Sequence, residues 1–362
     1  MRHNKQQVRK IEIDLTNNIK KLLSATKKNI VIFLPLGTYY KQLGNLPKKL
    51  SQKHNVVLAK TTPMPIDFES QFSSNISVGW LVRTTDGEMP IHIDLKEIDM
   101  IIEMDSSHLI GIEDGFLSKT AKRIFMPHSM LQAPKVSPHD YVIAPSKIFV
   151  ECYKRIHPNH TNQLIYGGYP KFDISLNQSL TRAIDRITYA PTLRIVDSMF
   201  ASSVCAGYDA NILEWLLNNT DEKIVYRPHP SAYSKKITEM YGMLKSRFVS
   251  ESHLIFDESP GDRFYTQTRM LITDCSTTAY TFSLSTLRPS VFFTPLESDD
   301  IEMVKHIHRI GCVAKNFQEL KQILDKNEDK SSEIAAFREE CVFNIGRSEE
   351  AICEAIDSIL CS

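Results

Sequence analysis

Short apolar runs rich in valine, isoleucine and phenylalanine alternate along this chain with segments long enough to form helices. The runs predict buried strands at residues 30–34, 55–58, 77–82, 99–103, 123–126, 141–144, 164–166, 187–190, 223–226, 253–256, 270–273 and 290–293. Helices are predicted after several of them, for example at residues 38–53, 146–157, 207–218, 234–246 and 276–285. Because uniformly apolar strands interleaved with helices are typical of parallel sheets covered on both faces, we expect an α/β fold.

The chain has 362 residues, which is beyond the size at which one hydrophobic core usually keeps growing. We therefore expect two doubly wound, Rossmann-like domains facing a cleft. The predicted divisions are a basic lead-in helix at 1–29, a first domain at 30–167, a polar linker at 168–186 and a second domain at 187–362. The chain reads as helix without a strand from about residue 331, and we expect this last segment to close the second domain.

Charge and cysteine content exclude several classes of protein. Lysines and arginines number 43, as do aspartates and glutamates, so the chain lacks the basic excess of a dedicated nucleic-acid binder. Seven cysteines without a CxxC pair fit neither a disulfide framework nor a zinc site, and they favour a reducing compartment. The longest apolar runs, such as 30–36, fall far short of the about 20 residues that a membrane span needs. We expect a cytoplasmic protein that is not integral to a membrane.

The first 29 residues form a basic segment with a helical pattern. Eight lysines and arginines stand against Glu12 and Asp14, and apolar residues recur at helical spacing, namely Ile11, Leu15, Ile19 and Leu22. A basic amphipathic helix can lie on anionic lipid, which would place the protein at the inner face of the cell membrane. It can equally be a lead-in helix packed on the first domain, and we favour this alternative.

Polar groups gather where the predicted strands end. Ligands of open parallel sheets bind beyond the carboxyl ends of the strands, so these junctions are the places to search. Four of them carry hydroxyl, guanidinium or imidazole groups: FMPHSM, YAPTLR, YRPHP and ITDCSTTAYTF. A solvent-exposed turn would explain any one of these segments, but agreement among four favours ligand binding.

The segment ITDCSTTAYTF places Thr273, Asp274, Ser276 and Thr277 between a strand and a helix. Hydroxyls and unpaired N–H groups at a helix N-terminus form a site for phosphate oxygens. Plain helix capping is the alternative, but it would need only one of these residues. Neither the P-loop motif nor the GxGxxG fingerprint occurs in the chain.

One arginine and two histidines follow strand ends. Arg227 offers bidentate contacts to phosphate, and His229 can stabilise an oxygen on which charge develops. His128 could act as a base on an acceptor hydroxyl, although a histidine at a strand end is often structural. His306 and His308 have no third ligand at a suitable spacing and no DxD motif occurs, so we expect no metal site.

With these residues in place, the chain resembles the CDP-glycerol glycerophosphotransferase family, the wall teichoic acid primases and polymerases, which is a branch of the GT-B glycosyltransferase architecture. The family's Arg-x-His-Pro, Ile-Thr-Asp-Tyr-Ser-Ser, Ala-Pro-Thr-x-Arg and Gly-x-Pro-Arg-x-Asp segments are matched by RPHP at 227–230, ITDCST at 272–277, APTLR at 190–194 and GYPKFD at 168–173. Cys275 stands in place of a tyrosine and Lys171 in place of an arginine. The family's Trp-His-Gly-Thr-Pro segment keeps only its histidine, His128.

The resemblance implies roles for particular residues. It makes His128 the acceptor-side base and His229 the catalytic histidine at the donor diphosphate. The implied donor-phosphate residues are Arg227, Thr273, Asp274, Ser276, Thr277, Thr192 and Arg194. The implied reaction moves a polyol phosphate from a CDP-activated donor such as CDP-glycerol to a hydroxyl of a lipid-linked or capsular glycan. Arginine, histidine and a helix N-terminus would supply the positive charge, so we expect neither a metal nor a cofactor.

Two other functions remain open from the sequence. A GT-B glycosyltransferase that uses a UDP- or CMP-sugar for capsule synthesis would carry similar donor motifs, and donor selectivity separates it from a polyol-phosphate transferase. A nucleotide-sugar-binding scaffold that has lost catalysis would bind a donor without turnover.

Overall fold

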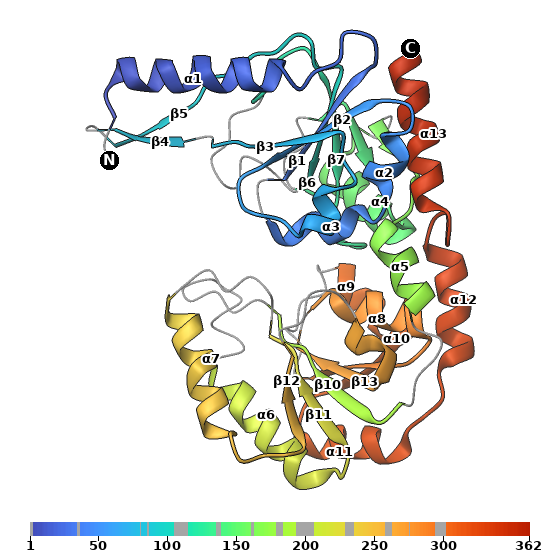
Figure 1. Cartoon of the computed structure of the whole chain (residues 1–362). Helices are drawn as coiled ribbons and strands as arrows, with labels where there is room; N and C mark the ends of the chain where they lie inside the picture. Colours follow the sequence, from blue (N-terminus) through green and yellow to red (C-terminus); the bar gives the residue numbers. More distant parts are fainter. Residues whose placement is uncertain are drawn as a thin grey trace. The chain divides into compact units, whose positions relative to one another are not determined.

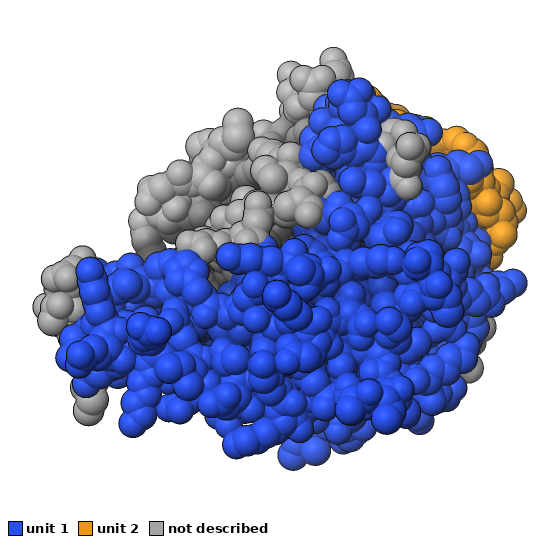
Figure 2. Space-filling view, turned by 90° about the horizontal axis from the view of Figure 1, so that it is seen from above, with its two compact units in different colours: residues 1–171, 342–362 blue, residues 172–341 orange. Residues whose placement is uncertain are grey.

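The computed structural model describes residues 3–34, 37–79, 81–84, 87–104, 115–134, 139–160, 163–178, 184–192, 206–228, 235–257, 263–274, 276–293 and 302–362. The chain forms two compact units, shown in blue and orange in Figure 2. Unit 1 comprises Met1–Lys171 and Val342–Ser362, and unit 2 comprises Phe172–Cys341. The chain therefore passes from unit 1 to unit 2 and returns to unit 1 at its end.

Unit 1 is built on a seven-stranded parallel sheet, counted over the described residues (Figure 1). Its order is β3-β2-β1-β6-β7-β8-β9, from β1 (Asn29–Leu34), β2 (Asn55–Lys60), β3 (Ser74–Ser77), β6 (Met100–Met104), β7 (Lys122–Met126), β8 (Tyr141–Ile143) and β9 (Leu164–Ile165). The helices of this unit are α1 (Lys5–Lys20), η1 (Gly37–Leu43), α2 (Leu46–Leu50), α3 (Ile66–Glu69), α4 (Lys147–Ile156) and α13 (Ser348–Cys361). A separate antiparallel pair joins β4 (Leu81–Thr84) to β5 (Gly87–Pro90).

Helices cover both faces of the first sheet because its central strands are apolar on both sides. All six residues of β1, NIVIFL, are buried. Ile30 and Ile32 belong to a core cluster that includes Ile352 of α13, while Val31 and Phe33 belong to another cluster. The second cluster is completed by α1, whose apolar residues Val8, Ile11, Leu15 and Ile19 contribute to it. The N-terminal helix is thus packed on the first domain, as the favoured sequence interpretation has it.

Unit 2 contains a six-stranded parallel sheet in its described part. Its order is β12-β11-β10-β13-β14-β15, from β10 (Arg186–Tyr189), β11 (Lys223–Tyr226), β12 (Leu254–Phe256), β13 (Thr268–Thr273), β14 (Ser290–Phe293) and β15 (Gly311–Ala314). Its helices are α5 (Pro170–Gln178), which begins in unit 1, and α6 (Ala206–Asn219), α7 (Lys235–Arg247), η4 (Arg263–Gln267), α8 (Thr278–Thr286), α9 (Glu302–Lys305), α10 (Ile307–Ile310), α11 (Phe317–Lys326) and α12 (Ser331–Cys341). Figure 1 shows α6 and α7 on one face of this sheet and α8 and α10 on the other.

In both sheets, the direction in which successive strands are added reverses beside the first strand of the sheet. In unit 1 the chain builds outward from β1 through β2 and β3, and then returns to the other side of β1 with β6. In unit 2 the same reversal separates β10 from β13. Ligands of doubly wound sheets bind at the carboxyl ends of the strands beside such a reversal, so each unit has one favoured edge for a site.

The doubly wound α/β fold predicted from the sequence is confirmed, with local differences. The predicted strand at 77–82 is instead divided between β3 and β4. The predicted helix at 38–53 is divided into η1 and α2, because Gly44 takes a positive φ of 57° between them. Two short strands were not predicted, β5 and β15, whose sequences GEMP and GCVA lack a long apolar run.

The last helix differs most from the sequence expectation, which placed it with the second domain. In the structure residues Val342–Ser362 cluster with unit 1. The reason is the apolar stripe of α13, since Ile352, Ile356 and Ile359 join the core that α2 and β1 share. The sequence shows that this stripe exists but does not show which sheet it covers.

Candidate functional site

The ends of β10 and β13 meet at the point where the second sheet reverses. Beyond these ends, the backbone N–H of Ala190 donates to the carbonyl of Ile272 at 2.9 Å. The hydroxyl of Thr273 donates to the carbonyl of Ala190 at 2.6 Å. The N–H of Thr192 donates to Oδ1 of Asp274 at 2.8 Å. The two sequence motifs that carry these residues are therefore joined side by side.

Thr273 and Asp274 are buried within this junction, with exposed fractions of 0% and 2%. The Thr273 hydroxyl also accepts a bond from the N–H of Ser276 at 3.3 Å, which fixes the turn that leads into α8. A buried polar group is stable only when it has hydrogen-bond partners, and here the partners are backbone groups of the two strand ends. These side chains shape the junction from inside.

Ser276 and Thr277 lie half-buried at the N-terminus of α8. The Ser276 hydroxyl accepts from the N–H of Thr278 at 3.3 Å. Thr277 stands at the N-cap position, yet its side chain makes no capping hydrogen bond. The partial positive charge of a helix N-terminus and nearby hydroxyls suit a phosphate. This helix end is the part of the junction best suited to contact an anion.

Arg227 follows β11 and is held by the neighbouring strand. Its N–H donates to the carbonyl of Tyr189 at 2.9 Å. Its Nη1 donates to the carbonyl of Asp257 at 3.1 Å and lies 3.2 Å from Oδ2 of the same residue. Asp257, which directly follows β12, was not singled out from the sequence; a carboxylate directly after a strand is the signal that could have found it.

Asp209 of α6 is a second functional candidate that the sequence reasoning missed. This fully buried carboxylate accepts from the hydroxyls of Tyr189 and Tyr226 at 2.7 and 2.8 Å. Each tyrosine is the last residue of its strand, β10 or β11. The shared pattern of a tyrosine ending both strands is the sequence signal for this contact, which fixes α6 to the edge of the sheet where Arg227 leaves it.

His229, Arg194 and Cys275 lie outside the described residues. The structure therefore brings together Arg227, Thr192, Thr273, Asp274, Ser276 and Thr277 at one edge of unit 2. It places His128 in unit 1.

His128 follows β7 in unit 1, separated from the strand only by Pro127. Its half-buried ring stacks on the ring of Tyr39, with centroids 5.2 Å apart and planes 25° apart. Its carbonyl accepts from the hydroxyl of Tyr169 at 2.7 Å. The imidazole is thus held at the carboxyl edge of the first sheet, where a ligand of that sheet would bind.

A buried charged cluster fixes the neighbouring strands of unit 1. Arg123 of β7 pairs with Glu103 of β6, and Nε2 of His139 lies 2.9 Å from Oε2 of the same glutamate. Burial lowers the pKa of the Arg123 guanidinium to about 10. The cluster lies inside the fold and joins β6, β7 and the segment before β8.

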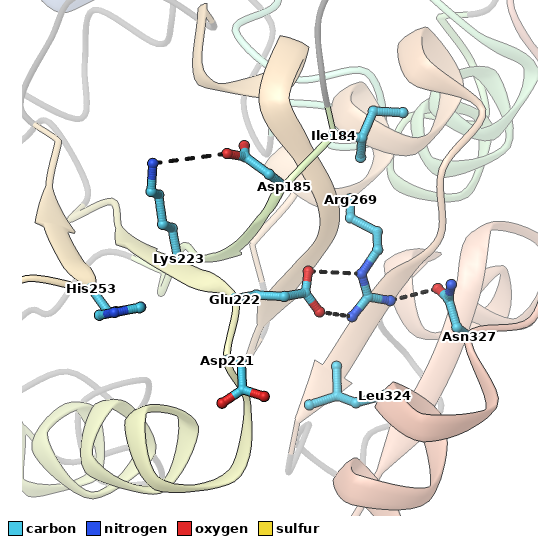
Figure 3. A pocket seen from close by; sticks show the side chains of 9 residues that line it. All are labelled: Ile184, Asp185, Asp221, Glu222, Lys223, His253, Arg269, Leu324 and Asn327. Carbon is cyan, nitrogen blue, oxygen red and sulfur yellow. Dashed lines mark hydrogen bonds and ion pairs between the residues drawn. The ribbon is translucent and has the colours of Figure 1, made fainter.

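The opposite edge of unit 2 contains a cavity of about 600 Å³ at the starts of its strands. It is lined by Ile184, Asp185, Asp221, Glu222, Lys223, His253, Arg269, Leu324 and Asn327 (Figure 3). The Arg269 guanidinium donates to both carboxylate oxygens of Glu222, at 2.9 and 2.5 Å, and to the side chain of Asn327. Since these groups bind one another and lie at the amino ends of the strands, the cavity does not belong to the candidate site.

The described residues contain no group of three or more histidine, cysteine, aspartate or glutamate side chains that could hold a metal ion. Within the same residues, no helix combines the length and apolar character needed to cross a membrane.

Comparison with known proteins identifies one matching family and several solved structures with a similar fold. The family CDP-Glycerol:Poly(glycerophosphate) glycerophosphotransferase matches residues 117–358. No curated protein sequence matches the chain. A variant of the wall teichoic acid polymerase TagF superposes with a TM-score of 0.60 at 14% identity, covering 96% of this chain and 93% of that one.

Other solved structures share this fold. TagF soaked with CDPG gives a TM-score of 0.58 at 16% identity, covering 99% of this chain and 98% of that one. The UDP-GlcNAc 2-epimerase of Methanocaldococcus jannaschii, in complex with UDP-GlcNAc and UDP, gives 0.57 at 12% identity over 91% and 99% of the two chains. At these identities the likeness establishes the fold alone, which is GT-B-like.

Proposed function

The chain belongs to the CDP-glycerol:poly(glycerophosphate) glycerophosphotransferase family, and from this premise we propose the chemical roles of its two half-sites. The donor half is the junction of β10, β11 and β13 in unit 2, which binds the diphosphate of CDP-glycerol. The acceptor half is the carboxyl edge of the first sheet around His128. The observation that carries the proposal is that three separate family motifs meet at the point where the second sheet reverses.

The reaction exchanges one phosphoester bond for another. An oxygen of the acceptor hydroxyl attacks the phosphorus that bears glycerol, and a P–O bond to it forms. The bond between this phosphorus and the bridging oxygen breaks, so the electron pair leaves with CMP. His128 accepts the hydroxyl proton, which makes it the general base of the transfer.

Charge develops on the departing CMP, and the donor half is suited to stabilise it. The N-terminus of α8, with Ser276 and Thr277, presents positive potential and hydroxyls to phosphate oxygens. Arg227 is held in place by Asp257, and His229 follows it in the sequence. Thr273 and Asp274 act from inside the junction by fixing Ala190 and Thr192, and Arg194 continues the same segment.

These groups supply the positive charge that a metal supplies in other transferases, so we propose that the reaction needs no divalent cation. Support comes from the chemistry of the donor residues and from the lack of a DxD motif in the sequence. Transfer that persists at full rate in EDTA is expected. A rate that falls and is restored by Mg²⁺ or Mn²⁺ would contradict the proposal.

A lipid-linked acceptor requires the protein to reach the membrane, and we propose α1 as the contact. Its buried stripe packs on unit 1, while Arg9 and Lys10 of the helix and Lys21, which caps its C-terminal end, are exposed. Ile13, also on the outer side, is 52% exposed. Basic residues around an exposed apolar side chain suit the surface of an anionic membrane.

The function is tested by nucleotide release from purified protein with a poly(glycerophosphate) primer. CDP-glycerol, CDP-ribitol, UDP-sugars and CMP-sugars are offered separately, beside His128→Gln and His229→Ala variants. We expect CMP release with CDP-glycerol and loss of about 100-fold or more in either variant, the range typical of general acid–base groups. Release of UDP would instead indicate a glycosyltransferase, and nucleotide binding without turnover would indicate a scaffold.

A further inference from the structure

The side chains around His128 come from two distant parts of unit 1, the η1 helix and the segment after β9. Tyr39 lies in η1 after β1, Gln42 lies one turn later, and Tyr169 follows β9. The sheet order places β6 between β1 and β7, so the contact between Tyr39 and His128 spans the end of β6. The surroundings of the imidazole are therefore a product of the tertiary structure.

The hydroxyl of Tyr169 fixes the backbone of His128. Tyr169 is 2% exposed, and its hydroxyl donates to the His128 carbonyl at 2.7 Å. The amide oxygen of Gln42 lies 3.2 Å from the same hydroxyl. One proton serves two acceptors here, and the shorter contact identifies the carbonyl of His128 as the main one.

The ring of Tyr39 fixes the plane of the imidazole. The two rings stack with centroids 5.2 Å apart and an angle of 25° between their planes. Stacked aromatic rings attract each other by about 0.5–1.5 kcal/mol beyond the area that they bury. Rotation of the imidazole about its side-chain bond would break this contact.

The route of the chain explains why Tyr169 reaches this position. Gly167 and Gly168 precede it, and Gly168 has a φ of +85°. A Cβ on Gly168 would lie 2.4 Å from the carbonyl oxygen of Phe343 and 2.8 Å from Cβ of Ser348. The segment that carries Tyr169 is therefore pressed against the segment that returns to unit 1, and only glycine fits there.

We propose that Tyr39 and Tyr169 are positioning residues for His128, one fixing its ring plane and the other its backbone. The inference rests on the proposed function, in which His128 is the general base. A base must lie within hydrogen-bond reach of the proton that it removes, and misplacement by about 1 Å can lower a rate by about 100-fold. Neighbouring side chains must therefore hold the imidazole of His128 in place relative to the acceptor hydroxyl.

The first test uses matched substitutions in η1. Tyr39→Leu removes the ring that stacks on His128, while Tyr40→Leu removes a neighbouring ring that instead packs on Phe68 at 5.0 Å. We expect Tyr39→Leu to lower kcat by about 10- to 100-fold with KM for CDP-glycerol within about two-fold. Tyr39→Phe, which keeps the ring, should recover most of this loss. Tyr40→Leu should lower stability and leave kcat within about two-fold.

The second test addresses the hydroxyl. Tyr169→Phe removes one oxygen and keeps the ring, and we expect kcat to fall by about 10-fold while the affinity of unit 2 for CMP stays unchanged. If Tyr169→Phe and Tyr39→Leu both keep wild-type kcat while His128→Gln is inactive, the positioning proposal is wrong and the proposed function stands.

A spectroscopic measurement tests the positioning role of Tyr39 separately from the role of His128 as the base. The imidazole proton resonance of His128, assigned by comparison with His128→Gln, should move in Tyr39→Leu and stay in place in Tyr40→Leu. An unmoved resonance in Tyr39→Leu would show that the rings do not stack in solution, and would overturn the proposal. Full transfer by His128→Gln would instead overturn the assignment of the base on which the proposal rests.

Discussion

At the scale of single residues, the proposed donor half-site contains residues that build the junction and residues that lie where a phosphate would bind. The side chains of Thr273 and Asp274 form hydrogen bonds with backbone groups of Ala190 and Thr192, whereas the side chain of Thr277 makes no capping hydrogen bond. Motif residues next to one another in sequence therefore have different physical tasks. The difference follows from the strand ending at Thr273, which turns that side chain into the junction.

Matched threonine substitutions test this division. Thr273→Val keeps the shape of the side chain but removes its bonds to Ala190 and Ser276, so we expect a loss of about 1–3 kcal/mol in the free energy of unfolding. Thr277→Val should change stability by less than about 0.5 kcal/mol and weaken CDP-glycerol binding. Urea unfolding and calorimetric titration measure the two effects. Equal stability losses in both variants would contradict the assignment.

At the scale of elements, two glycines near the start of α13 differ in how closely other atoms approach them. Gly168 and Gly346 both have positive φ angles, 85° and 76°. A Cβ at Gly168 would meet Phe343, whereas a Cβ at Gly346 would meet nothing within 4 Å. The cost of a side chain at a positive φ can therefore be measured at Gly346, and the added cost of a steric clash can be measured at Gly168.

Alanine at each glycine measures the two terms. Gly346→Ala should cost about 1–2 kcal/mol of unfolding free energy, because an alanine in the left-handed region is strained. Gly168→Ala carries the same strain and forces the backbone near Phe343 to move, which adds about 1–3 kcal/mol. Thermal and urea unfolding of the two variants provide the comparison, and a cost at Gly168 no greater than at Gly346 would contradict the contact.

The buried and exposed isoleucines of α1 report how this helix is attached. Ile19 is buried in the core of unit 1 and Ile13 is exposed. Ile19→Ala should lower the free energy of unfolding by about 2–5 kcal/mol, since it opens a cavity. Ile13→Ala should change it by less than about 0.5 kcal/mol. An effect at Ile13 as large as at Ile19 would show that α1 is packed on both sides.

The outer face of α1 is tested on vesicles of anionic phospholipid. Lys10→Glu and Lys21→Glu together should weaken vesicle binding by about 10-fold or more at low salt, because each basic residue contributes about 1 kcal/mol at such a surface. Lys48→Glu reverses one charge on α2, which is half of the charge change made in the double variant, and should bind like the wild type. Sedimentation with vesicles at two salt concentrations measures the effect. Equal weakening by the α2 variant would contradict a specific role of α1.

At the scale of the whole molecule, the chain returns from unit 2 to unit 1, where its last helix, α13, is held to α2 and to the turn after α2. Lys49 pairs with Glu349 and Glu350, and Asp357 binds Lys53 and His54 at 2.5 and 2.7 Å. Residues about three hundred positions apart in the chain thus close the first unit together. The contacts at the edge of this helix are largely ionic and depend on pH.

Acid should weaken the attachment of α13. The hydrogen bond from Lys49 lowers the pKa of Glu350 below its ordinary value of 4.5. Burial raises the pKa of Asp357, but its hydrogen bonds with Lys53 and His54 outweigh this and leave it below 3.8. A lowered folded pKa means that each carboxylate stabilises the fold above its ordinary value, and that this stabilisation is lost as the pH falls through the folded value.

Urea unfolding between about pH 3 and 6 measures this dependence. Lys49→Met with Lys53→Met removes the partners, so the stability of the variant should fall less steeply with acid than that of the wild type. Lys48→Met, a change at an exposed lysine of the same helix, should keep the wild-type slope. Identical slopes in all three proteins would mean that these pairs do not contribute.

The sequence alone determined most of the strands and helices and the motif residues, because apolar runs, helix-length intervals and polar strand ends are local properties of the chain. It did not show β5 and β15, which lack a long apolar run. It also sufficed to identify the family, since the RPHP and ITDCST segments combine residue types with fixed spacing. Only the tertiary structure decided which of these residues meet. Arg227 pairs with Asp257 in unit 2, and Tyr39 stacks on His128 in unit 1. In each pair the two residues follow different strands and meet at the carboxyl edge of one sheet. Thr273 is buried for the same reason, because two strand ends meet around it. The place of α13 was likewise decided by the surface that its apolar stripe covers. The hydrophobic effect has no direction, so the stripe could be buried against either sheet, and the sequence does not show which one.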